Sequence, residues 1–242
     1  MMTDQTLPLF YTNPRPLQAD RHGAWSLRTD AGHGFTAGTN SVPLMAAEFV
    51  AACKHVPILF TDGAVVQPVA LLGLRTGDNL FVDANGVWEE GTYVPAYVRR
   101  YPFIFMENAD KSEFTLCIDE DAESVVEGTD NPFFVDGKPS ALTDNALAFA
   151  KEFQAQHAFT AEFTDAVVAA NLLVDKRADI TLVNGERLSL AGFKVIDEEL
   201  FNQLPAEVLL AWRARGWLAL VYAHLISVSS WTGLVDRLAK RA

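Results

Sequence analysis

The most chemically distinctive segment of the chain runs from residue 93 to residue 105, YVPAYVRRYPFIF. It holds three tyrosines, two prolines and an adjacent pair of arginines within thirteen residues. Arginine beside aromatic rings can bind a carboxylate, a glycan or a peptide through planar hydrogen bonds and cation–π contacts. Alternatively, the rings fill a core edge while the arginines pair with the chain's surplus of acids. On the ligand-binding interpretation the candidate residues are Tyr93, Tyr97, Arg99, Arg100, Tyr101 and His224.

Known catalytic and nucleotide-binding motifs are missing from the sequence. There is no P-loop, H-E-x-x-H, C-x-x-C or G-x-S-x-G pattern, and the glycines of 32–38 have the wrong spacing for a dinucleotide fingerprint. The only local set with mixed ligand chemistry is His22 and His33 with Asp30, and their convergence with His224 stays open. We therefore assign no catalytic residue, metal or cofactor. An enzyme site remains an alternative, assembled from Tyr93, Arg99, Arg100, Asp119 and His224.

Two acidic runs could hold a hard cation or begin a helix. The first covers 119–123 (DEDAE) and lacks the alternate spacing and the glycine of a calcium loop. Acids in a first helical turn interact favourably with the helix dipole. We therefore favour a solvated helix start there, and also at Asp197–Glu199 (DEE).

Composition and charge restrict the class of protein. The 242 residues are 50% apolar and 21% charged, typical of a well-packed globular chain. A net charge of -12 opposes nucleic acid and anionic lipid. Cys53 and Cys117 lie in apolar runs and are predicted to be buried in a reducing compartment. The N-terminus lacks the basic start and apolar core of a secretory signal, so we expect a cytoplasmic protein.

One stretch, residues 217–235, has the length of a membrane span. Its nineteen residues include no Asp, Glu, Lys or Arg. However, it contains His224 and several hydroxyl residues, whose insertion costs would offset most of the apolar gain. We predict a soluble protein with no membrane span, in which this stretch is a buried amphipathic helix and His224 finds polar partners. The expected inward positions are Leu218, Val221, Tyr222, Leu225 and Val228.

The order of predicted elements indicates an α+β fold. Apolar runs predict strands at 24–29, 56–61, 68–74, 79–82 and 114–119, with one packed helix that starts at Pro43. The second half predicts helices at 142–157 and 161–173, the latter capped by Thr160, a strand pair around Gly192 at 187–190 and 193–196, and helices at 204–215, 218–229 and 232–240. We expect one domain over 1–242: a strand-rich part (1–126) with a mainly antiparallel sheet, a packed joint (127–140) and a helix-rich part (141–242).

Several segments together resemble the SapC family. They include VPL at 42–44, VPILF at 56–60, NLFVD at 79–83, RRYPF at 99–103, VIDE at 195–198 and YAHLIS at 222–227. The resemblance covers almost the whole chain. It implies a protein typical of Gram-negative proteobacteria, often encoded beside TonB-dependent outer-membrane receptors and halogenase-like or cupin-like proteins. The family name is similar to that of a peptide-transport permease. A permease needs several long apolar spans, and this sequence offers one candidate, residues 217–235. The resemblance carries over no catalytic residue.

Three functions fit these observations. The first is a non-enzymatic cytoplasmic binding or regulatory accessory protein of a nutrient-uptake locus, which holds a small anionic, sugar or peptide ligand or a partner protein through the 93–103 region. The second is an enzyme acting on a sugar, peptide or aromatic metabolite. The third is an interaction subunit that pairs with a halogenase-like or cupin-like enzyme, or with itself as a homodimer.

Overall fold

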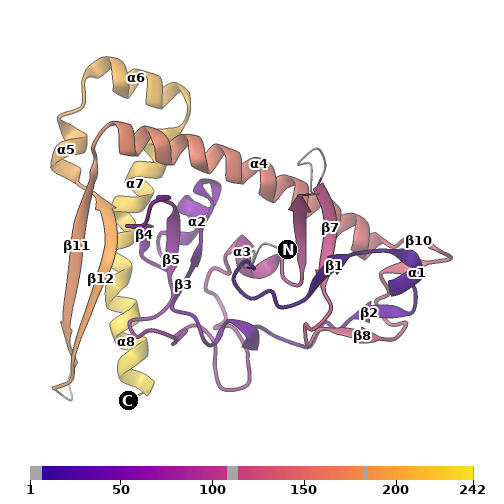
Figure 1. The fold of residues 1–242 in the computed structure, drawn as a ribbon. Helices are drawn as coiled ribbons and strands as arrows, with labels where there is room; N and C mark the ends of the chain where they lie inside the picture. Colours follow the sequence, from indigo (N-terminus) through magenta and orange to yellow (C-terminus); the bar gives the residue numbers. More distant parts are fainter. Residues whose placement is uncertain (1–6, 108–113, 183–184, 242) are drawn as a thin grey trace, which may run out of the picture.

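The structure, a computed structural model, describes residues 7–107, 114–182 and 185–241. It has the predicted α+β class, with antiparallel sheets and a helical C-terminal part (Figure 1). The strands are β1 Pro14–Pro16, β2 Trp25–Leu27, β3 Ser41–Pro43, β4 Ile58–Thr61, β5 Pro68–Leu71, β6 Phe103–Glu107, β7 Phe114–Asp119, β8 Val125–Glu127, β9 Phe134–Val135, β10 Lys138–Pro139, β11 Leu173–Thr181 and β12 Arg187–Ile196. The α-helices are α1 Ala19–His22, α2 Phe49–Ala52, α3 Ala96–Arg99, α4 Ala141–Ala169, α5 Glu198–Asn202, α6 Ala206–Ala214, α7 Trp217–Ser227 and α8 Trp231–Arg241.

The largest sheet has five antiparallel strands in the order β11-β12-β4-β5-β3. Helices α2 and α7 pack together, and α7 also contacts β4 and β12. The core between them contains Phe49, Phe60 and Phe163, all with no exposed surface. Full burial of a phenylalanine stabilises a fold by about 2 kcal/mol, so these rings fix the helices to the sheet.

A second, smaller body of structure contains the three-stranded sheet β1-β7-β6 and the two-stranded antiparallel sheet β2-β8. Its core is built from Phe103, Ile118 and Phe133, and Phe133 lies in the predicted joint, which is therefore packed. Helix α4 runs from the five-stranded sheet to this second body (Figure 1). Consequently, one face of α4 forms a wall along the region where the two bodies of structure meet.

The C-terminal stretch is helical and, as predicted, buries Val221 and His224, which have no exposed surface. Two of the expected inward positions, Tyr222 and Val228, are instead exposed, and Ser227 is fully buried. The Ser227 hydroxyl accepts from the Ile58 N–H (3.0 Å) and donates to the His224 carbonyl (2.6 Å). Because these polar groups bond the sheet, they face inward. By length and hydropathy alone, Trp217–Arg241 could cross a membrane, and 39% of its most apolar window is buried within the fold.

Four local predictions were wrong. Pro43 ends strand β3 and does not begin a helix. Thr160 lies inside the 29-residue helix α4, where its hydroxyl donates to the Gln156 carbonyl and accepts from the Ala46 N–H, so it caps no second helix. Gly192, at φ +82°, belongs to one continuous strand, β12, which pairs with β11 across a bulge. The predicted strand at 79–82 contributes only the bridge between Val82 and Trp88.

Candidate functional site

Helix α3 and a buried carboxylate hold the distinctive 93–105 segment in place. The Glu48 side chain is 7% exposed overall and accepts hydrogen bonds from the Ala96 N–H (2.7 Å) and the Tyr93 hydroxyl (2.9 Å). The same carboxylate accepts from the Met45 N–H (2.9 Å). Two of these charge-assisted hydrogen bonds therefore fix the start of α3 and, with it, the two arginines that follow, while the third holds Glu48 to its own turn of helix.

Arg100 lies among aromatic rings. Its guanidinium carbon is 4.1 Å from the ring centroid of Tyr97, 4.5 Å from Phe153 and 5.5 Å from Tyr11. The Nε atom is buried, and no described residue accepts a hydrogen bond from it. A buried donor without a partner costs free energy, so a ligand acceptor at this atom would recover part of that cost.

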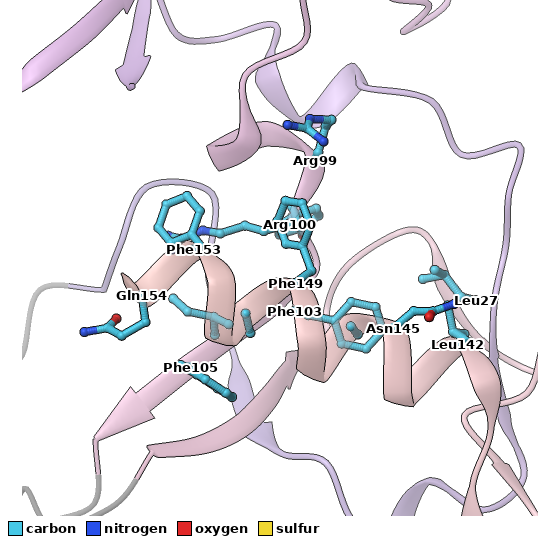
Figure 2. Close-up of a pocket in the computed structure, with 14 residues that line it drawn as sticks. Leu27, Arg99, Arg100, Phe103, Phe105, Leu142, Asn145, Phe149, Phe153 and Gln154 are labelled. Atoms are coloured by element: carbon cyan, nitrogen blue, oxygen red, sulfur yellow. The ribbon is translucent and has the colours of Figure 1, made fainter. Parts of the chain in front are cut away.

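Arg99 lies beside Arg100 and turns toward another ring of α4. Its Nε donates to the Val94 carbonyl (3.1 Å), and its guanidinium carbon is 5.4 Å from the centroid of Phe149. Tyr101 stacks on Phe35 at 4.3 Å between ring centroids. The two arginines thus project from the end of α3 toward the phenylalanines of α4, as Figure 2 shows for Arg100 and Phe153.

A pocket between α4 and β6, which we call the arginine pocket, is lined by Arg99, Arg100, Tyr101, Phe149 and Phe153 among others (Figure 2). Its volume is about 280 Å³. The wall is mostly apolar, with Asn145 and Gln154 as uncharged polar residues and Ala146 and Ala150 as small residues of α4. Among the described lining residues, the only ionic side chains are Arg99 and Arg100.

A second pocket of about 350 Å³ continues along α4 toward its C-terminal half, and we call it the threonine pocket. Thr160 and Thr164 lie in its wall with His157, and the opposite side is apolar. Arg100 and Phe153 line both pockets. In a chain with a net charge of -12, two adjoining pockets whose described walls contain no acid favour an anionic ligand.

The N-terminal arm, residues 7–16, closes one side of this region. The Tyr97 hydroxyl donates to the Leu9 carbonyl (3.2 Å), and Pro8 lines the threonine pocket. Asp119, with no exposed surface, accepts from the Thr12 and Asn13 N–H groups at 2.9 Å each. The acidic run at 119–123 is therefore not the solvated helix start that we predicted, because its first carboxylate fastens this arm.

Tyrosine hydroxyls near the arginines stay protonated at neutral pH. Burial, followed by the nearby Glu48 carboxylate, raises the pKa of Tyr93 to about 12. Burial also raises the pKa of Tyr97, and burial together with Asp119 raises the pKa of Tyr101. These groups therefore act as neutral hydrogen-bonding side chains, so the positive charge of the site comes from the arginines.

The structure separates two of the candidate residues from the rest. Tyr97, Arg99, Arg100 and Tyr101 line one or both pockets, whereas Tyr93 is bonded to Glu48. His224 lies between α7 and the five-stranded sheet, where its Nε2 accepts from the Ile196 N–H (3.0 Å). The five residues of the alternative enzyme site do not line a common pocket. Of those five residues, Asp119 lies close to the candidate residue Tyr101, whose hydroxyl is 3.5 Å from Oδ2 of Asp119.

The histidines His22, His33 and His224 lie in different parts of the fold. His22 is buried and its Nε2 lies 3.0 Å from a Glu120 oxygen, whereas His33 packs against Trp88, 5.7 Å between ring centroids. Burial lowers the pKa of His33. Within the described ranges, no group of three His, Cys, Asp or Glu side chains is arranged to hold a metal ion.

Sequence reasoning missed the residues that α4 contributes to the site. Phe149 and Phe153, with Ala146 and Ala150, lie within the helix predicted at 142–157 but were not among the candidate site residues. Their i, i+4 spacing was the available signal, but it predicts the same face whether a core or a pocket covers it.

The fold and the pockets define an α+β protein with two adjoining pockets beside one long helix, whose described lining includes Arg99 and Arg100 and no acid. The SapC family model matches residues 17–234, nearly the whole chain. The chain belongs to the SapC family. Neither the curated proteins nor the solved structures include a significant match to it.

Proposed function

We propose that this protein binds a small organic acid whose carboxylate is held by Arg100, with Arg99 contributing a second positive charge. The observation that carries the proposal is the Arg100 guanidinium, which is enclosed by rings and has no acidic partner among the described residues. Rings cover the faces of the guanidinium, so its edge is the part that can bond a ligand. A planar carboxylate suits that edge because it accepts two parallel hydrogen bonds.

On this proposal, the part of the ligand other than its carboxylate is apolar. Phenylalanine, isoleucine and leucine side chains form half of the described lining of the arginine pocket, represented by Phe103, Ile104 and Leu142. An apolar body buried there supplies affinity, while the arginines supply selectivity for the acid over its neutral analogue. The role is that of a non-enzymatic cytoplasmic binding protein. Its place as an accessory of a TonB-dependent nutrient-uptake locus rests on the family resemblance.

The test is a thermal-shift and calorimetric comparison of monocarboxylates with their neutral amides. We expect octanoate and 3-phenylpropionate to stabilise the protein and their amides to do so much less. The variant Arg100→Met, which keeps an unbranched apolar side chain, should abolish this difference. Arg100→Lys should restore it only in part, because lysine lacks the planar fork.

The matched control is Arg213→Met on the exposed end of α6, which removes the same charge away from both pockets. It should leave acid binding unchanged. Equal stabilisation by acids and amides, or full acid binding by a folded Arg100→Met variant, would refute the proposal.

A further inference from the structure

The two pockets meet at Arg100, where the α4 wall of one pocket ends and that of the other begins. Arg100 and Phe153 are the only described residues that the arginine pocket and the threonine pocket share. Along α4, the arginine pocket extends back to Leu142 and the threonine pocket extends forward to Thr164. A carboxylate on Arg100 would therefore have an apolar space on each side of it.

Both spaces suit apolar groups of moderate size. Volumes of about 280 and 350 Å³ lie near the lower limit for pockets that bind small molecules. The wall of the threonine pocket opposite α4 includes Leu44, Met45 and Val66, with Pro8 of the N-terminal arm. Neither pocket has an acid or a lysine among its described lining residues.

At the junction, Nε of Arg100 is a buried polar atom with no partner among the described residues. A buried donor without a partner is uncommon, so it points to a ligand group that can accept a hydrogen bond, and a carboxylate would satisfy it. Oγ1 of Thr164 is also buried without a described partner, but Thr164 lies eleven residues beyond Phe153, about 16 Å along α4, at the far end of the threonine pocket.

Building on the proposed function, we propose that the ligand is a carboxylic acid that branches next to its carboxylate and carries two apolar arms, as in an N-acylated apolar amino acid. The carboxylate bonds Arg100, one arm enters the arginine pocket and the other enters the threonine pocket. The amide of such a compound lies between the arms, next to the carboxylate at the junction. A straight-chain acid would fill only one of the two spaces.

The test uses N-octanoyl-L-phenylalanine and two truncated acids, N-octanoylglycine and N-acetyl-L-phenylalanine, in calorimetric titrations of the full chain. Each truncated acid keeps the carboxylate and amide but lacks most of one arm. Each buried methylene raises affinity about fourfold, so we expect the two-armed acid to bind at least about tenfold more tightly than either truncated acid.

Pocket-filling variants then assign the arms. Ala146→Phe narrows the arginine pocket and Ala161→Phe narrows the threonine pocket, while Ala158→Phe adds the same ring to an exposed position of α4 that lines neither. Ala146→Phe should remove the binding affinity that one arm adds, and Ala161→Phe should remove the binding affinity that the other arm adds. Ala158→Phe should leave all three affinities unchanged.

The possible failures are distinguishable. If a truncated acid binds as tightly as the two-armed acid, or if both pocket-filling variants reduce the gain from the same arm, the branched-ligand proposal is wrong. Acid binding that still depends on Arg100 would leave the proposed function intact in that case. If no carboxylate binds, both proposals fall. The ligand series on the unaltered chain decides the question even if a variant does not fold.

Discussion

The way His224 fixes α7 to the sheet predicts a specific pH dependence of stability. The ring has no exposed surface, and its Nε2 accepts a hydrogen bond from the Ile196 N–H at 3.0 Å. Burial, only partly offset by the backbone of Ile58, lowers the pKa of His224 to about 4. An accepting Nε2 cannot be protonated without losing this hydrogen bond, so the geometry and the pKa agree.

The sign follows from proton linkage. Histidine in an unfolded chain has a pKa of about 6.5, so between pH 6.5 and pH 4 the unfolded state binds a proton that the folded state does not. The stabilisation is complete above pH 6.5 and is lost as pH falls toward 4. With these two pKa values, His224 alone should lower the free energy of unfolding by about 2 kcal/mol between pH 7 and pH 5.

Urea unfolding at pH 7 and pH 5 measures this effect. The comparison variant is His224→Gln, whose amide oxygen can accept from the Ile196 N–H but does not titrate. The variant should be less stable at pH 7 because its shape fits less well, yet its loss between the two pH values should be smaller by about 2 kcal/mol. His33 contributes equally to both proteins. Identical pH dependence in the two proteins would refute the assignment.

Two further predictions concern the buried acid and the thiols. Asp119→Asn should destabilise the fold by about 2 kcal/mol and speed amide exchange in the N-terminal arm. The neutral amide has only one acceptor oxygen for the Thr12 and Asn13 N–H groups, which bond one carboxylate oxygen each. Asp121→Asn is the control, and equal effects would contradict the role of Asp119. Burial raises the pKa of the Cys117 thiol to about 11, so iodoacetamide at pH 8 should label it only after unfolding. Cys53 is half-buried and should react first, and equal labelling rates in the folded protein would contradict this.

The parts of the fold that were predicted correctly depend on local signals. Gly216, with φ +75°, separates α6 from α7, in agreement with the separate helices predicted at 204–215 and 218–229. Asp197 caps α5 by accepting from the Leu200 N–H (3.0 Å), in agreement with the predicted acidic helix start. In both places the residue's own backbone or side chain determines the structure, so no distant contact is needed to interpret it.

The wrong predictions have tertiary causes. Thr160 has the chemistry of a helix cap, but within α4 its hydroxyl bonds the preceding turn and accepts from the Ala46 N–H, 114 residues away. Tyr222 and Val228 are exposed because the inward face of α7 carries His224 and Ser227, which accept from N–H groups of β12 and β4. A hydropathy pattern assigns polar residues to the outside, since it contains no information about such partners.

The candidate site shows the same limit more sharply. Aromatic and arginine residues at 93–105 were recognised because they are unusual locally, but their meaning depends on what α4 places opposite them. Two alanines, Ala146 and Ala150, lie among the α4 residues that line the arginine pocket with Phe149 and Phe153. A longer side chain at either alanine would enter that space. Helical periodicity predicts that this face is covered, yet it cannot distinguish a filled core from a pocket, because that difference depends on side-chain volume contributed by β6 and α3.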